Sequence, residues 1–446
     1  MIRTFDEAAK FVEDHIRTSP LKMFRGEFGL KGSARFLELL GNPQNKLKVI
    51  HVAGTSGKGS TCFFASQILG ALGFSTSLTI SPHLVDMRER CQINNGFISE
   101  KEFVTILNSM IPAIEEMKKS EYEKPSYFML LLGLSFLAAV NHKVDYAVVE
   151  TGFGGLYDGT NNISREDKVC IINRIGLDHT EILGNTVEAI ALQKAGIIGN
   201  GNMTFSSEQE AAAKKVIMKR TNEAFARLEF ITEPENIFDA GIINDRAVFS
   251  FRRDGLIIHD IVLATPAYYQ IFNCSLALAA VAYLGKRDGF SIDEVKIKRK
   301  LSAVGFEGRM QSVKNGPKRI ILDGAHNPQK MENFIDSLKR TIKGKPCFLV
   351  SFKEGKDYKK MLDLIAPVAA AIIVTDFDIG MDMAHKSQDP EDIRQYLKSA
   401  GFNQVKIVSG PLNAYKALLE SKCAELVVTG SLYLLSFVYP LAAESK

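Results

Sequence analysis

Short apolar runs alternate with longer segments of helical periodicity along most of the chain. Continuous apolar runs predict buried strands, and apolar residues that recur every three or four positions predict helices. Pro125 stands just before one such helix, where proline favours a helix start. In the first half the predicted strands are 47–53, 76–80, 144–150 and 169–173, and the predicted helices are 59–72, 100–119 and 126–141. This alternation is typical of an α/β fold with mainly parallel sheets.

A second series of strands and helices follows a more irregular middle region. The Arg-Arg-Asp-Gly stretch at 252–255 predicts the turn of a hairpin. The next predicted elements are helices at 267–285 and 292–304 and strands at 319–322, 346–351, 371–375, 404–408 and 426–429. We therefore expect a larger domain at 1–304 with a mainly parallel sheet, a linker at 305–309 and a smaller, doubly wound, Rossmann-like domain at 310–446.

The composition is that of a folded, globular protein. The chain has 446 residues, of which 46% are hydrophobic and 24% charged, and these values argue against disorder and collagen-like repeats. The 55 Lys and Arg residues nearly balance the 51 Asp and Glu residues, without a long basic run, so nucleic acid is not an expected partner. The longest apolar run, 128–140, is shorter than the roughly 20 residues of a spanning helix, so no membrane contact is expected.

Cysteine usage and the first residues both bear on the cellular compartment. The six cysteines form no C-x-x-C pair, and they are Cys62, Cys91, Cys170, Cys274, Cys347 and Cys423. Buried, reduced thiols are therefore expected in place of a disulfide framework or a zinc site. Asp6 and Glu7 occur where a signal peptide would carry an apolar segment. These features predict a cytoplasmic protein.

A glycine-rich turn joins the predicted strand at 47–53 to the predicted helix at 59–72. Its glycines would let backbone N–H groups turn toward one point, where the helix N-terminus favours an anion and Lys58 supplies a mobile cation. The residues expected to contact a nucleoside triphosphate are Gly54, Thr55, Ser56, Gly57, Lys58, Gly59 and Ser60. Val52 occupies the first glycine position of the G-x-x-x-x-G-K-[ST] pattern, and Gly59 precedes Ser60. The alternative is a turn that only joins strand to helix, and the loop alone identifies no more than an ATPase or GTPase.

Further motifs follow the phosphate loop in a fixed order. They are Ser81-Pro82-His83-Leu84, Val149-Glu150-Thr151-Gly152-Phe153-Gly154-Gly155, Asp158-Gly159-Thr160-Asn161, Asp178-His179-Thr180-Glu181-Ile182-Leu183-Gly184, Lys194-Ala195-Gly196-Ile197, Gln270 with Asn273, Gly308-Arg309, Asp323-Gly324-Ala325-His326-Asn327-Pro328 and Thr429-Gly430-Ser431-Leu432-Tyr433. With the loop they cover residues 25–435. In order and spacing this set resembles the folylpolyglutamate synthase and dihydrofolate synthase family of the Mur ligase superfamily.

The resemblance implies an ATP-dependent acid–amino-acid ligase with an N-terminal ATP-binding domain and a C-terminal glutamate-ligase domain. ATP would phosphorylate the carboxylate of a folate or a dihydropteroate, and the amine of L-glutamate would attack the acyl phosphate. A carboxylate is a poor electrophile until it carries a leaving group, and phosphoryl transfer depends mainly on positioning and charge neutralisation. The implied cofactors are ATP and two Mg²⁺ ions, the partners are small molecules, and a monomer is expected.

The resemblance places Mg²⁺ ligands at Ser81, Glu150 and His179, and the Ser60 hydroxyl is a further candidate. Glu150 ends a predicted strand, and Ser81 and His179 follow strand ends, so the three can meet at the carboxyl edge of one sheet. Taken singly, a helix-capping serine, a surface acid and a hydrogen-bonded histidine are the alternatives. Lys194 is implied to be carbamylated near a second Mg²⁺, whereas the residues alone favour a solvent-facing lysine.

Other positions are assigned by the resemblance to the nucleotide and the substrates. Asn273 would face adenine and Arg309 phosphate, while Asp323 and His326 would lie near the ribose, the linker and the glutamate. The alternative for Asp323 is a turn or helix cap, a common use of Asp before Gly. The implied substrate contacts are His83, Asp158 and Ser431. The expected catalytic set is Lys58, Lys194, Asp323 and His326.

The chain departs from the usual family pattern at Leu156, Gly159 and Glu307. These departures bear on substrate choice more than on reaction type, and we rank folylpolyglutamate synthesis first and dihydrofolate synthesis second. A Mur-type amino-acid ligase is the runner-up, but the stretch before Gly54 is too short for an additional nucleotide-binding domain of typical size. A regulatory ATP-binding protein without catalysis is the third hypothesis, and such a protein would have little need of metal and acyl-transfer positions together.

Overall fold

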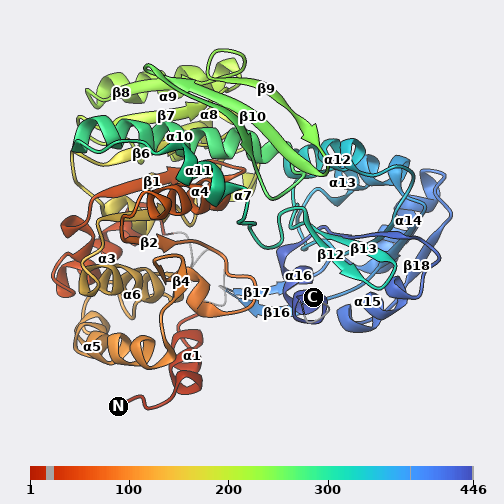
Figure 1. The fold of residues 1–446 in the computed structure, drawn as a ribbon. Coiled ribbons are helices and arrows are strands. Elements are labelled where there is room, and N and C mark those ends of the chain that lie inside the picture. The colour runs from red at the N-terminus through yellow and green to blue at the C-terminus, as the bar shows by residue number, and fades with distance from the viewer. Residues whose placement is uncertain (17–24, 382, 444–446) are drawn as a thin grey trace. The chain divides into compact units, whose positions relative to one another are not determined.

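Two compact units make up the chain, for which a computed structural model describes residues 1–16, 25–381 and 383–443. Unit 1 comprises residues 1–238, 250–261 and 272–301, and unit 2 comprises residues 239–249, 262–271 and 302–446. Each unit contains a mainly parallel sheet with helices packed on it (Figure 1). The predicted α/β fold class is confirmed.

The sheet of unit 1 has the strand order β4-β3-β2-β5-β1-β6-β7-β8. Its strands are β1 (Val49–Ala53), β2 (Thr76–Thr79), β3 (Gln92–Ile93), β4 (Gly96–Phe97), β5 (Tyr146–Glu150), β6 (Val169–Ile172), β7 (Met203–Ser207) and β8 (Arg227–Ile231). Neighbouring strands from β2 to β8 pair in parallel, while β3 pairs antiparallel with β2 and β4. All five residues of the central strand β1 are buried, as expected for a parallel strand covered on both faces.

The helices of unit 1 begin where the sequence offers caps. The α-helices are α1 (Phe5–Glu13), α3 (Gly26–Leu39), α4 (Lys58–Ala71), α5 (Glu100–Lys118), α6 (Tyr127–Asn141), α7 (Thr180–Leu183), α8 (Val187–Ala195), α9 (Ala211–Glu223), α10 (Tyr269–Asp288) and α11 (Glu294–Leu301). Short 3₁₀ helices are η1 (Pro43–Lys46), η2 (Met87–Arg90) and η3 (Gly159–Asn162). The hydroxyls of Ser99 and Ser126 accept hydrogen bonds from backbone N–H groups in the first turns of α5 and α6. These N-caps fix the starts of the two helices.

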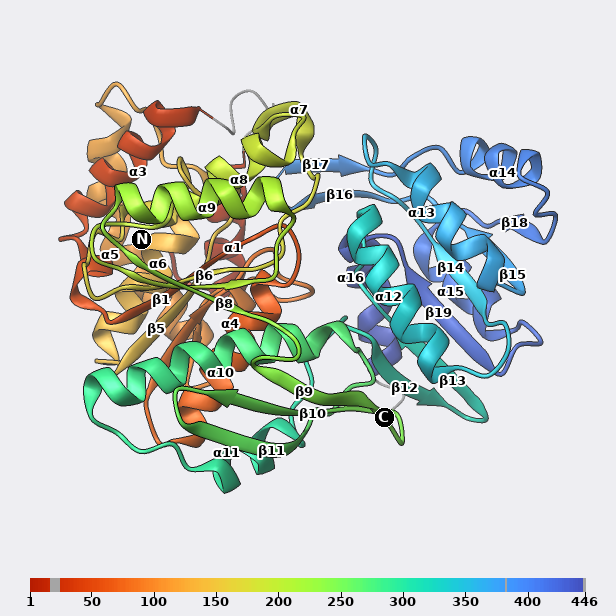
Figure 2. The ribbon, with the colours of Figure 1, turned by 90° about the horizontal axis from the view of Figure 1, so that it is seen from above.

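Side-chain direction along β5 shows that helices cover both faces of the sheet. Val149 packs in one apolar cluster with Leu132 and Phe136 of α6. The next residue, Glu150, faces Lys58 at the start of α4. Because successive strand side chains point to opposite faces, α6 and α4 lie on opposite faces. The neighbouring helices α8 and α9 run side by side (Figure 2).

A three-stranded sheet has the order β11-β10-β9. It consists of β9 (Ile237–Ile243), β10 (Arg246–Arg253) and β11 (Leu256–Val262), so the hairpin turn predicted at 252–255 is confirmed. Residues of this sheet are divided between the two units, as are those of α10. Unit 2 also contains the segments 239–249 and 262–271, which lie within the larger domain predicted at 1–304. The predicted limits of 1–304, 305–309 and 310–446 therefore stay a prediction.

Unit 2 is built on a sheet with the strand order β12-β13-β19-β14-β15-β18. The strands are β12 (Gln311–Asn315), β13 (Lys318–Leu322), β14 (Cys347–Val350), β15 (Ala371–Val374), β18 (Val405–Ile407) and β19 (Glu425–Thr429), with a separate pair β16 (Asp378–Met381) and β17 (Met383–Lys386). The helices are α12 (Pro328–Thr341), α13 (Tyr358–Ile365), η4 (Ala366–Val368), α14 (Pro390–Ser399), α15 (Pro411–Leu419) and α16 (Leu432–Ala443). Strands β13, β19, β14, β15 and β18 are parallel, and β12 pairs antiparallel with β13.

Apolar side chains from α12, α13 and α14 form one core with the sheet of unit 2. Phe334 of α12 and Leu362 of α13 pack there with Phe348 of β14. Figure 1 shows α12 and α13 on one side of this sheet and α15 and α16 on the other. The carboxyl ends of β13 and β19 are neighbours because these strands pair in parallel.

Two cysteines differ from the prediction of reduced thiols. Cys347 and Cys423 form a disulfide with Cα atoms 5.8 Å apart, so the prediction was wrong for this pair. Cys347 begins β14 and Cys423 comes just before β19, and these two strands pair in parallel. The two cysteines are 76 residues apart, so no local pattern in the sequence predicts that they pair. Cys62, Cys91, Cys170 and Cys274 are buried thiols, as predicted.

Replacement of Cys423 by serine is expected to lower the free energy of unfolding of unit 2 by about 4 kcal/mol, since the unfolded chain then loses a long closed loop. Denaturant unfolding of the wild-type protein and of Cys423→Ser, each with and without reductant, measures this difference. Reductant should lower the wild-type midpoint and leave that of the variant unchanged. A wild-type midpoint that does not respond to reductant contradicts the prediction.

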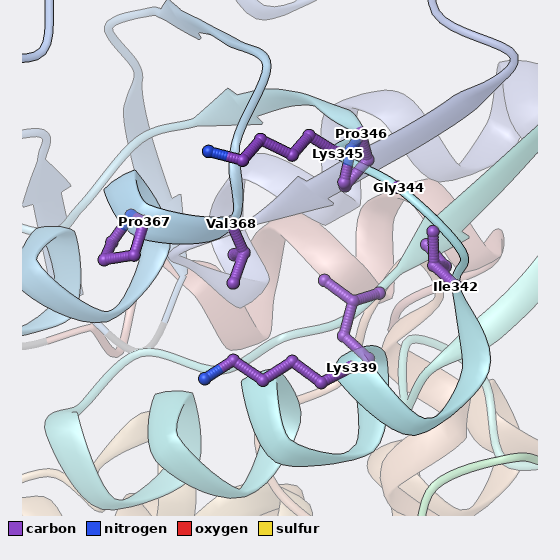
Figure 3. A pocket seen from close by; sticks show the side chains of 8 residues that line it. Lys339, Ile342, Gly344, Lys345, Pro346, Pro367 and Val368 are labelled. Carbon is purple, nitrogen blue, oxygen red and sulfur yellow. The ribbon is translucent and has the colours of Figure 1, made fainter.

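A surface pocket of about 280 Å³ lies at the amino edge of the sheet in unit 2. Leu338, Ile342 and Pro346 line it, and Figure 3 shows Lys339 and Lys345 extending along it in the same direction. Pro346 immediately precedes β14, whereas ligands of parallel sheets usually bind beyond the carboxyl ends. The pocket is therefore separate from the predicted site residues of this unit, which follow β13 and β19. Within the described ranges, no helix has both the length and the apolar run that a bilayer crossing requires.

Candidate active site

The glycine turn follows β1 and ends at the first residue of α4. Gly54 has a φ of +147° and Gly57 a φ of +93°, backbone conformations that L side chains rarely adopt. Because α4 begins at Lys58, the N–H groups of its first turn have no carbonyl acceptor within the helix. A turn of this kind between a parallel strand and a helix can bind an anion.

The segment after β6 anchors this turn. Backbone N–H groups of Thr55 and Ser56 donate to the carbonyl of Arg174 at 3.1 and 3.4 Å. The Thr55 hydroxyl donates to the carbonyl of Gly176 at 3.0 Å and accepts from its N–H at 3.1 Å. The N–H groups of Thr55 and Ser56 thus hold the conformation of the turn. The N–H groups at the start of α4 are the part of this segment that could bind an anion. Contact of Thr55 and Ser56 with ATP stays a prediction.

Glu150 lies at the end of β5, against the start of α4. Its Oε2 accepts the backbone N–H of Ser81 at 2.9 Å, and its Oε1 is 3.9 Å from the Nζ of Lys58. A Cβ at Gly59 would be only 3.1 Å from Oε2, so the glycine leaves room for the carboxylate. Ser60 is the next residue of α4 and is buried. The structure thus brings Ser81, Glu150 and Lys58 together at one sheet edge.

His179 precedes α7 with a left-handed backbone, φ 52°. Its ring meets that of Phe153 edge-on, with centroids 4.9 Å apart, and Phe153 follows β5. Its Nε2 is 3.9 Å from Asp178 and its Nδ1 is 3.8 Å from Glu181. No three His, Cys, Asp or Glu side chains gather into a metal-binding group in the described part of the chain. A cation site here would therefore depend on serine hydroxyls as well, and the metal roles stay predictions.

Lys194 is buried in the last turn of α8, so the solvent-facing lysine favoured by the residues alone was wrong. Its Nζ donates to the carbonyl of Gly54 at 2.9 Å. Burial, with the nearby charge of Lys58, lowers the pKa of Lys194 to about 7. A large share of this amine is then neutral near pH 7, which is the form that adds CO₂.

Asn273 of α10 lies against the glycine turn. Its Oδ1 would be 2.1 Å from a Cβ at Gly57, so only glycine leaves space for the amide. The same oxygen accepts from Asn173 Nδ2 at 3.1 Å, and that nitrogen also donates to Thr61 Oγ1 at 2.8 Å. Asn173 follows β6 and links α10 to α4 at the turn.

His83 is buried and accepts a hydrogen bond at Nδ1 from Arg90 Nε, 2.8 Å away. Arg90 is itself buried, with its guanidinium over the ring of Tyr127. Since Nδ1 accepts, the neutral imidazole carries its proton on Nε2. A substrate contact of His83 stays a prediction.

Asp158 is buried within the loop that follows β5. Its Oδ1 accepts from the N–H and the hydroxyl of Thr160 at 2.9 and 2.6 Å, and its Oδ2 accepts from the N–H of Phe153 at 2.7 Å. Burial raises the pKa of Asp158. Behind the loop, His51 Nε2 is 2.9 Å from the hydroxyl of Thr160. The carboxylate thus organises its own loop, and its predicted substrate contact is not tested.

Asp323 in unit 2 is held by three donors after the end of β13. The hydroxyl of Tyr269 and the N–H of Met310 donate to Oδ2 at 2.7 and 2.8 Å, and the N–H of Ala325 donates to Oδ1 at 2.8 Å. Burial raises its pKa, while the charge of Arg309 acts in the opposite direction. A Cβ at Gly324 would lie 2.6 Å from Arg309 Nη1, so the guanidinium borders this loop.

His326 and Ser431 lie on two adjacent loops of unit 2. The N–H of Gly430 donates to the carbonyl of Ala325 at 3.1 Å and joins the loops. His326 contacts the carbonyl of Gly324 at 2.8 Å and the Nζ of Lys330 at 2.8 Å. Ser431 is buried, and its hydroxyl accepts from the N–H of Tyr433 at 3.0 Å. This bond caps the start of α16, and a role for Ser431 toward glutamate stays a prediction.

Several side chains that contact the predicted residues were not predicted from the sequence. Asn173 is the last residue of the strand predicted at 169–173, so its place at the carboxyl edge was a usable signal. Lys330 comes four residues after His326. This spacing predicts a contact only when the conformation of the turn before α12 is known, because His326 lies outside the helix. Arg90 and Tyr269 gave no local signal, because their partners depend on how separate elements pack.

The chain's α/β architecture, with a glycine turn between a central strand and a helix, is that of phosphate-loop proteins. Residues 307–441 match the family described as "Dihydrofolate synthetase, C-terminal domain". The dihydrofolate synthase/folylpolyglutamate synthase of Bacillus subtilis is 31% identical over 408 residues, which cover 87% of this chain and 94% of the relative. The dihydrofolate synthetase of Saccharomyces cerevisiae is 30% identical over 92% of this chain and 96% of its own.

Solved structures give the same assignment. Folylpolyglutamate synthase from Mycobacterium tuberculosis, complexed with ADP, has a TM-score of 0.86 and 25% identity over 98% of both chains. The Thermotoga maritima enzyme has a TM-score of 0.80 and 27% identity over 99% of this chain and 97% of its own. The chain belongs to the dihydrofolate synthase/folylpolyglutamate synthase family, and the resemblance inferred from its motifs is confirmed.

Proposed function

We propose that this chain is an ATP-dependent ligase that joins L-glutamate to the carboxylate of a folate through an acyl phosphate. The observation that carries the proposal is the placement of Lys58, on the first turn of α4, beside Glu150 at the end of β5. Its family membership over nearly the whole length of the relatives supports the same activity. Folylpolyglutamate synthesis is ranked first and dihydrofolate synthesis second.

The residues of unit 1 would bind and orient the triphosphate. The start of α4 presents N–H groups to an anion, and Lys58 adds a positive charge that balances the phosphates. Asn273 borders the turn at Gly57, which suits a contact with the nucleoside. Phosphoryl transfer to the folate carboxylate breaks the β–γ phosphoanhydride and releases ADP. The glutamate amine then attacks the acyl phosphate, forms the amide bond and releases phosphate.

The residues at the end of β5 suit a magnesium ion. Glu150 offers a carboxylate, and Ser60 and Ser81 offer hydroxyls, a set of the hard oxygen donors that Mg²⁺ prefers. When bound, Mg²⁺ would neutralise negative charge on the phosphates. His179, a second ion and the carbamylation of Lys194 are carried over from the family, and the neutral form of the buried Lys194 amine suits that modification.

A mass-resolved product assay tests the proposed function. Purified protein is incubated with ATP, Mg²⁺ and L-glutamate, and with either tetrahydrofolate or dihydropteroate. We expect a product heavier by one glutamyl residue, and ADP release that requires both the acceptor and glutamate. Glutamate-independent ATP hydrolysis would favour a regulatory ATP-binding protein, and activity only with cell-wall precursors would favour a Mur-type ligase.

Replacement of Gly57 by alanine is expected to raise the apparent KM for ATP by about tenfold or more. The new methyl group would meet Asn273 Oδ1 at 2.1 Å in a backbone with φ +93°. Positive φ alone costs a non-glycine residue roughly 1–2 kcal/mol, so some loss of stability accompanies the change. Steady-state kinetics and thermal unfolding measure the two effects.

Gly73→Ala is the matched control for this substitution. Gly73 comes just after the other end of α4 and has a φ of +96°. A Cβ at this position would have no heavy atom within 4 Å apart from those of its chain neighbours. Its replacement should therefore lower stability through the backbone alone and leave the KM for ATP unchanged. Equal KM values for both variants would contradict the role assigned to Gly57.

A further inference from the structure

A buried histidine in the central strand of unit 1 contacts the loop that follows β5. His51 is the third residue of β1, and its side chain is fully buried. Its Nε2 is 2.9 Å from the hydroxyl oxygen of Thr160 and 3.1 Å from that of Thr151. Thr151 directly follows β5 and Thr160 is in η3, so the imidazole contacts the loop at both of its ends.

The hydrogen bonds of Thr160 determine which nitrogen of His51 carries the proton. The hydroxyl of Thr160 donates to Oδ1 of Asp158 at 2.6 Å, so toward His51 its oxygen can only accept. Nε2 therefore carries the proton and donates it, and Nδ1 has none. Burial, with the positive charge of Lys168, holds the pKa of His51 well below its usual range, so the ring stays neutral. A chain of donated hydrogen bonds runs from His51 through Thr160 to Asp158.

The second ring nitrogen shows that packing alone does not account for a histidine at this position. Nδ1 is buried and has no hydrogen-bond partner among the residues that the structure describes. A buried polar atom without a partner lowers stability, and an apolar side chain would avoid this cost. The other residues of β1 are all apolar, namely Val49, Ile50, Val52 and Ala53. The donor at Nε2 is therefore the property that distinguishes His51 from its neighbours in the strand.

His51 joins the loop after β5 to the strand that carries the glycine turn. Gly54 comes three residues after His51 in the chain, and β1 and β5 are neighbours in the sheet. The loop begins next to Glu150, the carboxylate proposed for Mg²⁺. The acceptor carboxylate has to meet the γ-phosphate at this carboxyl edge, where the loop lies. Because transfer between two bound substrates depends on their alignment, the position of the loop relative to the turn bears directly on the rate.

We propose that His51 is a positioning residue, which holds the loop of Asp158 and Thr160 at a fixed place relative to the glycine turn and so aligns the acceptor carboxylate with ATP. The proposal rests on the proposed function, because it names a residue that aligns the two substrates of that same ligase. His51 acts through Thr160 and touches neither substrate. Its loss should therefore impair use of the acceptor and leave the binding of ATP nearly unchanged.

Two amide variants of His51 test the proposal. The side-chain nitrogen of glutamine is as many bonds from Cα as Nε2 of histidine, whereas that of asparagine is one bond closer, as Nδ1 is. We expect His51→Asn to lower kcat/KM for the acceptor that the wild-type protein uses, tetrahydrofolate or dihydropteroate, by about tenfold or more. The KM for ATP should stay near wild type. His51→Gln restores a donor toward Thr160 and should recover most of the loss.

Thr160→Val tests the same chain of hydrogen bonds from the loop side. Valine matches threonine closely in shape but has no hydroxyl, so kcat/KM for the acceptor should fall about as far as in His51→Asn. The double variant should lose little more than either single variant, because both changes break one chain. Thr76→Val is the matched control. Thr76 of β2 is also fully buried, and its hydroxyl is 3.0 Å from that of Ser66, so this change should lower stability without altering kcat/KM.

The pattern of losses separates alignment of the acceptor from a merely structural role. All rates are measured below the thermal midpoint of each variant, and Thr160→Val decides the question if His51→Asn does not fold. An unchanged kcat/KM for the acceptor would overturn the proposal, as would equal losses in His51→Asn and His51→Gln or an equal rise in the KM for ATP. Absence of ligation by the wild-type protein would instead overturn the proposed function.

Discussion

Replacement of Lys58 by alanine is expected to reduce ATP-dependent ligation by on the order of 10³-fold, with the fold preserved. Lys58 is the first residue of α4, and its ammonium faces Glu150 across 3.9 Å at the end of the glycine turn. The substitution removes a positive charge from the place where negative charge would develop on the phosphate during transfer. The side chain is not part of the apolar core, so the free energy of unfolding should change little. Initial-rate kinetics and denaturant unfolding measure the two quantities.

The matched control is Lys219→Ala. Lys219 is on α9, its side chain is 77% exposed, and it pairs only loosely with Glu223 at 3.8 Å. Removal of this charge should leave the rate of ligation at the wild-type value. Near-normal turnover of Lys58→Ala, with nucleotide saturating, would remove Lys58 from the catalytic set.

Glu150→Gln is expected to lower kcat by roughly 10²-fold or more, because it removes the anionic oxygen donor proposed for the Mg²⁺ ion that offsets the phosphate charge. The substitution is nearly isosteric, and the amide oxygen can still accept the N–H of Ser81, now received by Glu150 Oε2 at 2.9 Å. The geometry of the loop after β2 should therefore survive. We also expect a higher Mg²⁺ concentration for half-maximal rate. Kinetics at several Mg²⁺ concentrations measure both effects.

Glu223→Gln provides the comparison for this second variant. Glu223 ends α9 at the surface and its side chain is 53% exposed, so loss of its charge should affect neither kcat nor the Mg²⁺ dependence. If Glu150→Gln keeps both parameters at their wild-type values, Glu150 does not serve the metal. Loss of thermal stability in Glu150→Gln would point to a structural role for the carboxylate.

The apolar pattern located the central strands because their residues are buried on both faces. The run at 47–53 contains β1 and the run at 144–150 contains β5, and every residue of both strands is buried. The two-residue strands β3 and β4 are too short to give a pattern. The edge strand β8 has only one buried residue, Ile231, and so it lacked a continuous apolar run.

Local patterns also found the polar residues at strand ends, but not the partners that packing gives them. Ser81, Glu150 and His179 were predicted at one sheet edge, and a hydrogen bond joins the first two. The burial of Lys194 depends on a contact with Gly54, 140 residues away in the chain. No period or propensity encodes such a contact. The lysine therefore looked like a surface residue until α8 was placed against the turn.

The hydrogen bonds inside the loop after β5 determine how much order a ligand must impose there. Asp158 and Thr160 already tie this loop to itself, and His51 supports it from the adjacent strand. Its backbone conformation is thus set when the chain folds, before any acceptor arrives. A molecule that binds beside it loses little affinity to ordering of protein segments, which is the general advantage of a preorganised surface.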